Sequence, residues 1–301
     1  MQDELVASLE TLMAAEKLPT SFHISVETIF QPLTKRIADR HAAIGAPVIV
    51  GICGPQGSGK STGVLAMRLL LEAQGLRVAT LSLDDLYLPL EDRRRLASEV
   101  HPLFATRGPP GTHDVQLGIT LLDRLRTRSP VALPSFDKAV DDRRPCAHWD
   151  DFEGPADIIL FEGWCVGARP QSQDMLVDPI NELERSCDAD GVWRMQVNAA
   201  LARYQSMFSR IDIQVLLMPP AFDVVAGWRC EQEAKLRDRM TPDRSGHSVM
   251  TDGEILRFVQ HYERLTLHIM AEMPQRAEAV IELGRARELR RMILRDEQPA
   301  G

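Results

Sequence analysis

A glycine-rich segment in the first quarter of the chain constrains the fold more than any other feature of the sequence. It consists of Gly54, Pro55, Gln56, Gly57, Ser58, Gly59, Lys60 and Ser61, followed by Thr62. The apolar run 47–53 before it predicts a buried strand, and residues 62–67 predict the first turns of a helix. The pattern G-x-x-x-x-G-K-[ST] between a strand and a helix is that of a phosphate-binding P-loop. We therefore predict a nucleoside-triphosphate site at residues 54–62.

Each residue type in this segment has a chemical reason to be there. Glycines allow backbone conformations that other residues avoid, so N–H groups can surround phosphate oxygens. The helix that begins near Lys60 directs the positive end of its dipole at the same phosphates. We expect Lys60 to reach the β- and γ-phosphates and the Ser61 hydroxyl to bind Mg²⁺, so ATP and Mg²⁺ are the expected ligands. The alternative is a strand–turn–helix connection that is rich in glycine for geometry alone.

The composition of the chain narrows its class and its partners. The 301 residues are 44% hydrophobic, enough to bury the core of one large domain or two smaller ones. The formal net charge of −8 argues against a general nucleic-acid or membrane-surface binder, so an anionic substrate would need a local cluster of Arg and Lys. The five cysteines form no C-x-x-C pair, and no apolar run reaches membrane-spanning length. We expect a cytoplasmic protein that acts on a small molecule, with no nucleic acid or membrane as partner.

Strands that alternate with helices predict the architecture. Apolar runs predict further strands at 77–83, 157–163, 211–217 and 279–283 and a short edge strand at 131–134. Helical patterns lie at 3–17, 91–99 (solvent-exposed), 115–126, 173–186, 191–208, 222–240, 252–272 and 285–295. This order predicts an α/β fold of the P-loop NTPase class, a doubly wound, mostly parallel sheet with helices on both faces and a helical lid. We expect residues 1–45 to form a helical extension and 46–301 the P-loop domain, with insertions at about 86–150 and 222–262.

Two of the predicted strands end in carboxylates. Glu162 ends the run 157–163, and Asp84 and Asp85 follow the run 77–83. Because open α/β sheets bind ligands at the carboxyl ends of their strands, we expect these side chains near the P-loop. Asp84 is the candidate base for an alcohol, with Asp85 as its competitor, and Ser61, Asp84 and Glu162 are the candidate Mg²⁺ ligands. The alternatives are a helix N-cap for Asp84 and a surface-facing strand end for Glu162.

Polar and basic side chains gather on two loops that should converge over the same edge of the sheet. Cations there suit a carboxylate or phosphate on the molecule that accepts the phosphoryl group, although solvated surface charges are the alternative. The candidate acceptor-binding residues are Asp85, Tyr87, Arg107, Thr112, His113, Asp114, Asp137, Lys138, Arg143 and Arg144. On the helix predicted at 222–240, a lid over the phosphates would use Arg229, Lys235, Arg237 or Arg239. An exposed, charge-laced helix is the alternative for that segment.

Several of these segments carry a family resemblance. These segments resemble the corresponding motifs of the plant-type D-glycerate 3-kinases and their microbial relatives. They are the P-loop, Leu81–Tyr87, Gly111–Asp114, Phe136–Lys138, Leu160–Trp164, Val197-Asn198 with Leu201 and Tyr204, and Trp228-Arg229 with Glu233. The resemblance covers about residues 47–265 and implies a place among the uridine, pantothenate and phosphoribulose kinases. It implies that Asp84 activates the acceptor hydroxyl and that Glu162 is the Walker-B carboxylate. It also implies a lid arginine in the region 229–239, for which Arg229 is our candidate.

The resemblance implies a reaction as well as a fold. We expect an ATP-dependent kinase that phosphorylates a hydroxyl of a small organic acid, with D-glycerate giving 3-phosphoglycerate. The chain departs from the family pattern on the acceptor side, where Phe136 stands in place of a tyrosine and the loop 139–144 is compact. The alternative acceptors are a nucleoside, pantothenate or a sugar. An alternative of another class is a nucleotide-dependent switch or assembly ATPase without a small acceptor.

Overall fold

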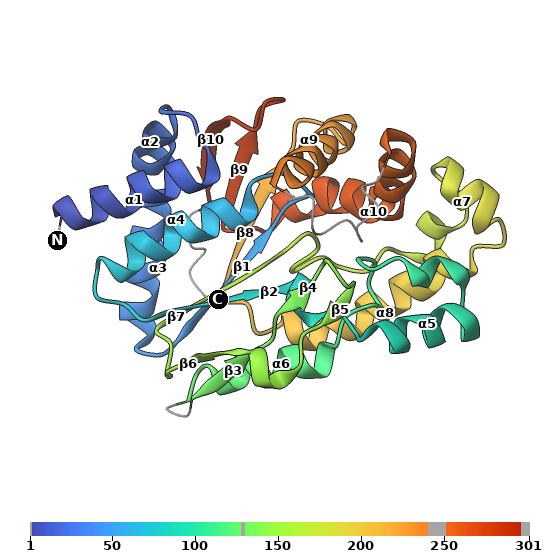
Figure 1. Cartoon of the computed structure of the whole chain (residues 1–301), viewed down its shortest axis with the longest axis horizontal. Coiled ribbons are helices and arrows are strands. Elements are labelled where there is room, and N and C mark those ends of the chain that lie inside the picture. The colour runs from blue at the N-terminus through green and yellow to red at the C-terminus, as the bar shows by residue number, and fades with distance from the viewer. Residues whose placement is uncertain (1, 128–129, 240–250, 296–301) are drawn as a thin grey trace.

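A six-stranded sheet runs through the middle of the molecule in a computed structural model that describes residues 2–127, 130–239 and 251–295 (Figure 1). Its strand order is β10-β9-β8-β1-β7-β2. The bounds are Val48–Cys53 for β1, Val78–Ser82 for β2, Ile158–Gly163 for β7, Ile213–Met218 for β8, Ala279–Leu283 for β9 and Leu289–Leu294 for β10. The neighbouring strands pair in parallel, except that β10 runs antiparallel to β9. The predicted α/β class with a mostly parallel sheet is confirmed.

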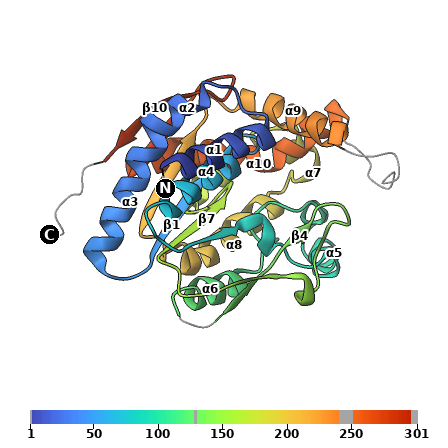
Figure 2. The same ribbon diagram turned by 60° about the vertical axis from the view of Figure 1, so that its left-hand side comes forward.

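Both faces of the sheet are buried, as the continuous apolar strands predict. Val48, Val50 and Ile52 of β1 belong to one apolar cluster, and Ile49 and Cys53 belong to the other. The first face is covered by α1 (Gln2–Glu16), α3 (Gln31–Ile44) and α4 (Lys60–Glu72), and the second by α6 (Val115–Arg124), α8 (Val192–Phe208) and α10 (Asp252–Glu272). Figure 2 shows α4 and α8 on opposite sides of β1 and β7.

The helices before β1 share the core of the sheet. Between α1 and α3 the chain forms α2 (Phe22–Ser25) and a π-helical turn, Val26–Phe30. Leu9, Phe30, Leu33 and Ile37 from these helices are buried in the same apolar cluster as Met67 of α4. The predicted division of the chain into an extension and a P-loop domain stays a prediction.

The insertion between β2 and β7 begins at the carboxyl end of β2 and returns to the amino end of β7. It contains the 3₁₀ turn Leu83–Leu86, α5 (Leu90–Glu99), α6 and two small antiparallel pairs, β3 (Val131–Leu133) with β6 (Asp150–Phe152) and β4 (Phe136–Asp137) with β5 (Asp142–Arg143). After β7 the chain forms α7 (Glu182–Cys187), α8 and α9 (Asp223–Arg239). Figure 1 shows β4 and β5 beside the end of β2.

Three predictions of local structure are wrong. The segment 285–295 is not a helix, because β10 pairs with β9 there and places Leu289 and Met292 against the core. The predicted helix 173–186 divides into a 3₁₀ turn and α7, with Pro179, which has no N–H to donate, between them. The helix near 91–99 exists as α5 but is not wholly solvated, because Arg93 is completely buried.

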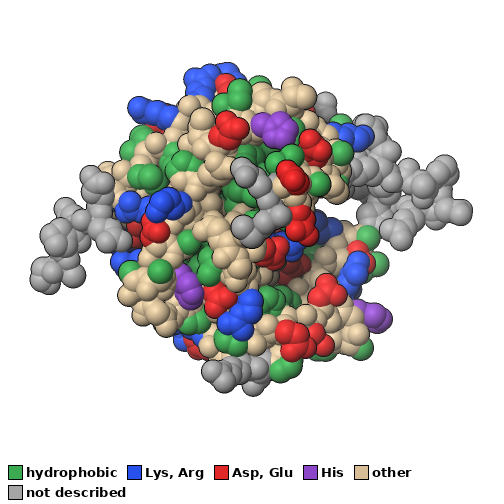
Figure 3. All heavy atoms as spheres, turned by 90° about the vertical axis from the view of Figure 1, so that its left-hand side faces the viewer, with side chains coloured by type: hydrophobic (Ala, Val, Ile, Leu, Met, Phe, Trp, Pro, Cys, Tyr) green, Lys and Arg blue, Asp and Glu red, His purple; other side chains and the backbone are tan. Residues whose placement is uncertain are grey.

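Charged side chains of both signs are interspersed on the face drawn in Figure 3, where Lys and Arg lie beside Asp and Glu. Among the described residues, the structure has no helix with the length and apolar character that a bilayer crossing needs.

Candidate functional site

The glycine-rich segment joins β1 to α4 as the sequence predicts. Gly57 and Gly59 have φ angles of +72° and +87°, a region that other residues rarely adopt. Helix α4 begins at Lys60, so its unpaired N-terminal amides lie at the turn. The Lys60 ammonium donates to the Pro55 carbonyl oxygen at 3.1 Å, which places the cation over the turn. Backbone amides, a helix N-terminus and a cation thus meet where a phosphate can bind.

Glu162 connects the P-loop to two strand ends. In the register of the sheet it lies between Ile52 of β1 and Ser82 of β2. Its Oε1 accepts hydrogen bonds from the hydroxyls of Ser61 at 3.1 Å and Ser82 at 3.2 Å. The sequence placed Glu162 and Ser61 near each other but assigned no role to Ser82. The spacing of Ser82 two residues before Asp84 was the available signal.

The oxygen donors at this point suit Mg²⁺. This ion keeps several waters and takes one or two carboxylates together with substrate phosphates. In the part of the chain that the structure describes, no three His, Cys, Asp or Glu side chains gather into a dedicated metal cage. The Ser61 hydroxyl and the Glu162 carboxylate, which share a hydrogen bond, match a Mg²⁺ site in which the protein supplies few ligands and the substrate phosphates supply others. Their role in metal binding, and that of Asp84, stays a prediction.

Asp84 lies in the 3₁₀ turn directly after β2 and uses both carboxylate oxygens. Oδ1 accepts from the Tyr87 hydroxyl at 2.9 Å, and Oδ2 accepts from the Lys138 ammonium at 2.8 Å. Burial acts against the charged form, but the charge and hydrogen bond of Lys138 outweigh it and hold the pKa of Asp84 well below its usual range. The carboxylate is therefore ionised and keeps lone pairs for an acceptor hydroxyl.

Asp85 has a different position from its neighbour. Its Oδ1 accepts from the backbone N–H of Phe136 at 3.0 Å, which ties β4 to the end of β2. Burial raises the pKa of Asp85 to about 6. The two adjacent carboxylates are thus distinguished by structure, because Asp84 pairs with a cation and Asp85 anchors a strand.

The loop 107–114 is held from within the protein. The buried Tyr204 hydroxyl accepts from the backbone N–H of Gly111 at 2.8 Å and of His113 at 3.3 Å, and lies 2.9 Å from His113 Nδ1. The His113 ring stacks on Tyr87 with centroids 4.6 Å apart, and burial lowers the pKa of His113 to about 3. The Thr112 hydroxyl is also buried and donates to the Pro109 carbonyl oxygen at 2.8 Å. Thr112 and His113 therefore shape the loop, and their contact with an acceptor stays a prediction.

Four of the other predicted acceptor residues form ion pairs around the β4–β5 hairpin. Asp114 caps α6 by accepting from the N–H of Leu117 at 3.0 Å, and its carboxylate lies 3.3 Å from the Arg143 guanidinium. Arg143 also donates to the Tyr87 carbonyl oxygen at 2.7 Å. Asp137 lies 3.5 Å from the more exposed Arg144. The hairpin is thereby fixed to the segment that follows Asp84.

Helix α9 contacts the P-loop through Trp228. A Cβ atom on Gly57 would lie 2.7 Å from Trp228 Cβ, so this glycine permits the close approach. Arg229 follows, 9% exposed, and its guanidinium carbon lies 5.6 Å from the centre of the Phe258 ring. The Arg229 guanidinium thus faces α10, and its contact with the phosphates stays a prediction. The other lid candidates lie outside the described side chains, namely Lys235, Arg237 and Arg239.

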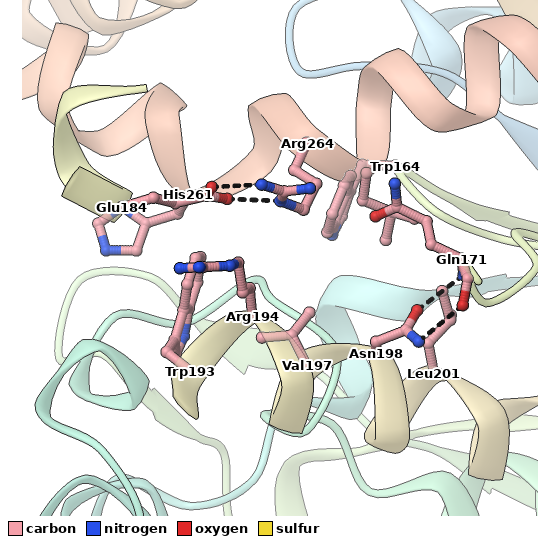
Figure 4. A pocket seen from close by; sticks show the side chains of 11 residues that line it. Trp164, Gln171, Glu184, Trp193, Arg194, Val197, Asn198, Leu201, His261 and Arg264 are labelled. Carbon is pink, nitrogen blue, oxygen red and sulfur yellow. Dashed lines mark hydrogen bonds and ion pairs between the residues drawn. The ribbon is translucent and has the colours of Figure 1, made fainter. Parts of the chain in front are cut away.

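A small cavity lies between α7, α8 and α10 (Figure 4). Its volume of about 20 Å³ accommodates a single water molecule. At one end the Asn198 amide exchanges two hydrogen bonds with the backbone of Gln171, at 2.8 and 3.0 Å. At the other end Glu184 pairs with Arg264 at 2.6 Å. These contacts hold the segment after β7 against its helices, and the space is too small for an acceptor.

The chain is similar to kinases from fungi and plants. No protein-family model matches it. It is 34% identical over 248 residues to "Uncharacterized kinase mug58" of Schizosaccharomyces pombe, an alignment that covers 79% of this chain and 86% of that protein. It is 31% identical over 229 residues to the chloroplastic D-glycerate 3-kinase of Arabidopsis thaliana, covering 72% of this chain but 46% of that longer protein. The solved structure of a D-glycerate 3-kinase from Cryptococcus neoformans matches with a TM-score of 0.71 at 27% identity, over 89% of this chain and 99% of that one.

Proposed function

Because the chain belongs to the P-loop kinase family of D-glycerate 3-kinases and their microbial relatives, we propose that it phosphorylates D-glycerate with ATP. The γ-phosphoryl group is transferred to the 3-hydroxyl and gives 3-phosphoglycerate. The observation that carries the proposal is the pairing of Asp84 with Lys138 at 2.8 Å, at the same sheet edge as the P-loop and Glu162. A base for an alcohol and a cation for an acid are thereby joined in one place.

The residues around the ATP phosphates have separate tasks in this proposal. The amides at 54–62 and the Lys60 ammonium bind the phosphates of ATP and neutralise charge on the γ-phosphoryl group. Ser61 and Glu162, with Asp84 as the third candidate, are the residues that would hold Mg²⁺, which supplies charge neutralisation when bound. Arg229, the residue after Trp228 on α9, is our candidate for the cation on the lid side. Positioning and electrostatic stabilisation are the main sources of the rate.

On the acceptor side, Asp84 orients the hydroxyl and takes its proton as the new P–O bond forms. The Tyr87 hydroxyl and the Lys138 ammonium keep the carboxylate fixed and ionised. Two aromatic rings lie between Arg107 and Asp84. The Arg107 guanidinium is 5.7 Å from the centre of the Phe136 ring, and Phe136 packs edge-on against Tyr87, whose hydroxyl donates to Asp84. We assign the acceptor carboxylate to Arg107 and Lys138. Lys138 pairs with Asp84, and Arg107 is partly exposed and connects to Asp84 through the Phe136 and Tyr87 rings.

A coupled assay of ADP release tests this function. The purified protein with ATP and Mg²⁺ is offered D-glycerate, L-glycerate, other hydroxy acids, pantothenate, sugars and nucleosides. We expect D-glycerate to stimulate ADP release well above the background hydrolysis and the product to be 3-phosphoglycerate. The variant Lys60→Ala is the control for a contaminating kinase. Stimulation by a nucleoside, pantothenate or sugar instead would replace the acceptor, and no stimulation by any compound would refute the kinase proposal.

A further inference from the structure

Helix α5 carries many charges, yet it buries one of its arginines. Arg93 has no exposed surface, whereas its neighbours Arg94 and Arg95 face solvent. A buried guanidinium is stable only when its charge and its N–H donors are satisfied. The Arg93 guanidinium lies 3.0 Å from the Asp141 carboxylate, contacts the carbonyl oxygen of the same residue, and donates from Nε to the Leu88 carbonyl oxygen at 3.2 Å.

Asp141 lies at the turn of the β4–β5 hairpin in a strained conformation. Its φ angle is +56°, in the left-handed region that costs energy for a residue with a side chain. The surroundings must impose such a conformation, and the ion pair with Arg93 does so from inside the protein. Arg107 contacts the other carboxylate oxygen of Asp141. The turn is thus fixed from two sides.

Two arginines share one carboxylate and one aromatic ring. The guanidinium carbons of Arg93 and Arg107 lie 5.8 and 5.7 Å from the centre of the Phe136 ring. Two positive charges face one negative charge, so the cluster keeps one uncompensated positive charge. Arg107 carries it toward the open side, because 26% of its side chain is exposed and Arg93 is sealed.

The contacts of Arg93 join the separate parts of the acceptor site. Leu88 follows Tyr87 on the segment that carries Asp84, and the hairpin held through Asp141 carries Lys138, whose ammonium reaches Asp84 at 2.8 Å. Through Asp141 the network also includes Arg107. We propose that Arg93 is a positioning residue that sets Arg107 and Lys138 at the distance that an anionic acceptor requires. This inference rests on the kinase function proposed above.

The substitution Arg93→Met tests it, because methionine fills much of the same space without charge or donors. A matched control is Arg194→Met. Arg194 is also buried, pairs with the Asp188 carboxylate at 3.0 Å, and donates to the carbonyl oxygens of Leu176 and Val177 at 2.7 and 2.9 Å. We expect both variants to lose thermal stability. Arg93→Met should raise KM for D-glycerate about tenfold or more and change KM for ATP less than about twofold, whereas Arg194→Met should leave both KM values within about twofold.

A double variant tests whether Arg93 acts through Arg107. If it acts partly through Arg107, Arg93→Met combined with Arg107→Met should raise KM for the acceptor by less than the product of the two single effects. Effects that multiply would overturn this route of action. An unchanged acceptor KM in Arg93→Met, or an equal rise in Arg194→Met, would overturn the proposal as a whole.

Hydrogen exchange separates this inference from the proposed function. If the unmodified protein turns over no acceptor, the kinase proposal fails. Exchange of the backbone amides at 136–143 still tests whether Arg93 holds the β4–β5 hairpin in place. We expect these amides to exchange at least about tenfold faster in Arg93→Met than in either the unmodified protein or Arg194→Met. Exchange that is unchanged in Arg93→Met would refute the role of Arg93 in holding the hairpin, whatever the acceptor is.

Discussion

Removal of one hydroxyl group, in Tyr204→Phe, should destabilise the protein and loosen the acceptor loop together. In the folded chain this oxygen accepts from two backbone N–H groups, at 2.8 and 3.3 Å, and lies 2.9 Å from His113 Nδ1. Tyr204 is 1% exposed, so phenylalanine leaves these groups without a replacement from water. A buried donor that loses its partner costs about 1–3 kcal/mol. Since one of the bonds is long, we expect a total loss of about 2–4 kcal/mol in the free energy of unfolding.

Urea denaturation measures this loss through the midpoint, provided that the slope m is unchanged. The control is Tyr262→Phe, the same substitution at a site with 2% exposure, where the hydroxyl makes one bond of 2.8 Å to the Arg107 carbonyl oxygen. That loss should be about 1 kcal/mol. A loss in Tyr204→Phe that does not exceed that of Tyr262→Phe would refute the view that the Tyr204 hydroxyl organises residues 107–114.

Three further predictions address catalysis, the P-loop and pH. Asp84→Asn should lower kcat by about 10²–10⁴-fold while calorimetry still detects ATP binding, and near-normal turnover would exclude Asp84 as the base. Lys60→Ala should instead weaken ATP binding itself. Gly57→Ala should lower Tm more than Gly59→Ala. Both glycines have positive φ, but a Cβ at Gly57 would meet Trp228, whereas one at Gly59 would meet nothing within 4 Å. Equal Tm values in the two variants would contradict the contact between the P-loop and α9. Burial lowers the pKa of His113 to about 3, so the unfolded chain binds the proton first as pH falls below about 6.5. The His113 contribution to stability should therefore drop by about 2 kcal/mol between pH 7 and pH 5, and His113→Asn should show a correspondingly smaller drop in urea denaturation; identical drops would disprove a buried, neutral imidazole.

The sequence predicted the frame of the candidate site because its signals are local. The strand, turn and helix around 47–67 are specified by neighbouring residues, and Glu162 and Asp84 each end an apolar run. Parallel strands bring such ends to one edge, so the proximity of Glu162 and Ser61 followed from the pattern alone. The pairing of Asp84 with Lys138 did not follow, because the two residues are 54 positions apart and Lys138 lies on a separate small hairpin.

Local composition misled the prediction where a distant partner decides the structure. The basic segment 285–295 has a helical composition, but the edge of β9 offers backbone groups that β10 satisfies. The charges of α5 predicted an exposed helix, but Asp141, 48 residues away, draws Arg93 inside. Charge patterns alone do not distinguish a solvated arginine from one that is paired and buried.

The sequence by itself determined the phosphate-binding turn, the parallel α/β sheet and the two carboxylates at strand ends, because backbone propensity and apolar periodicity act over a few residues. The tertiary structure decided which cations and hydroxyls surround those carboxylates. Tyr204 reaches Gly111 across 93 positions, and Trp228 packs on Gly57. Such contacts depend on how the helices pack on the sheet, and packing is a property of the whole chain.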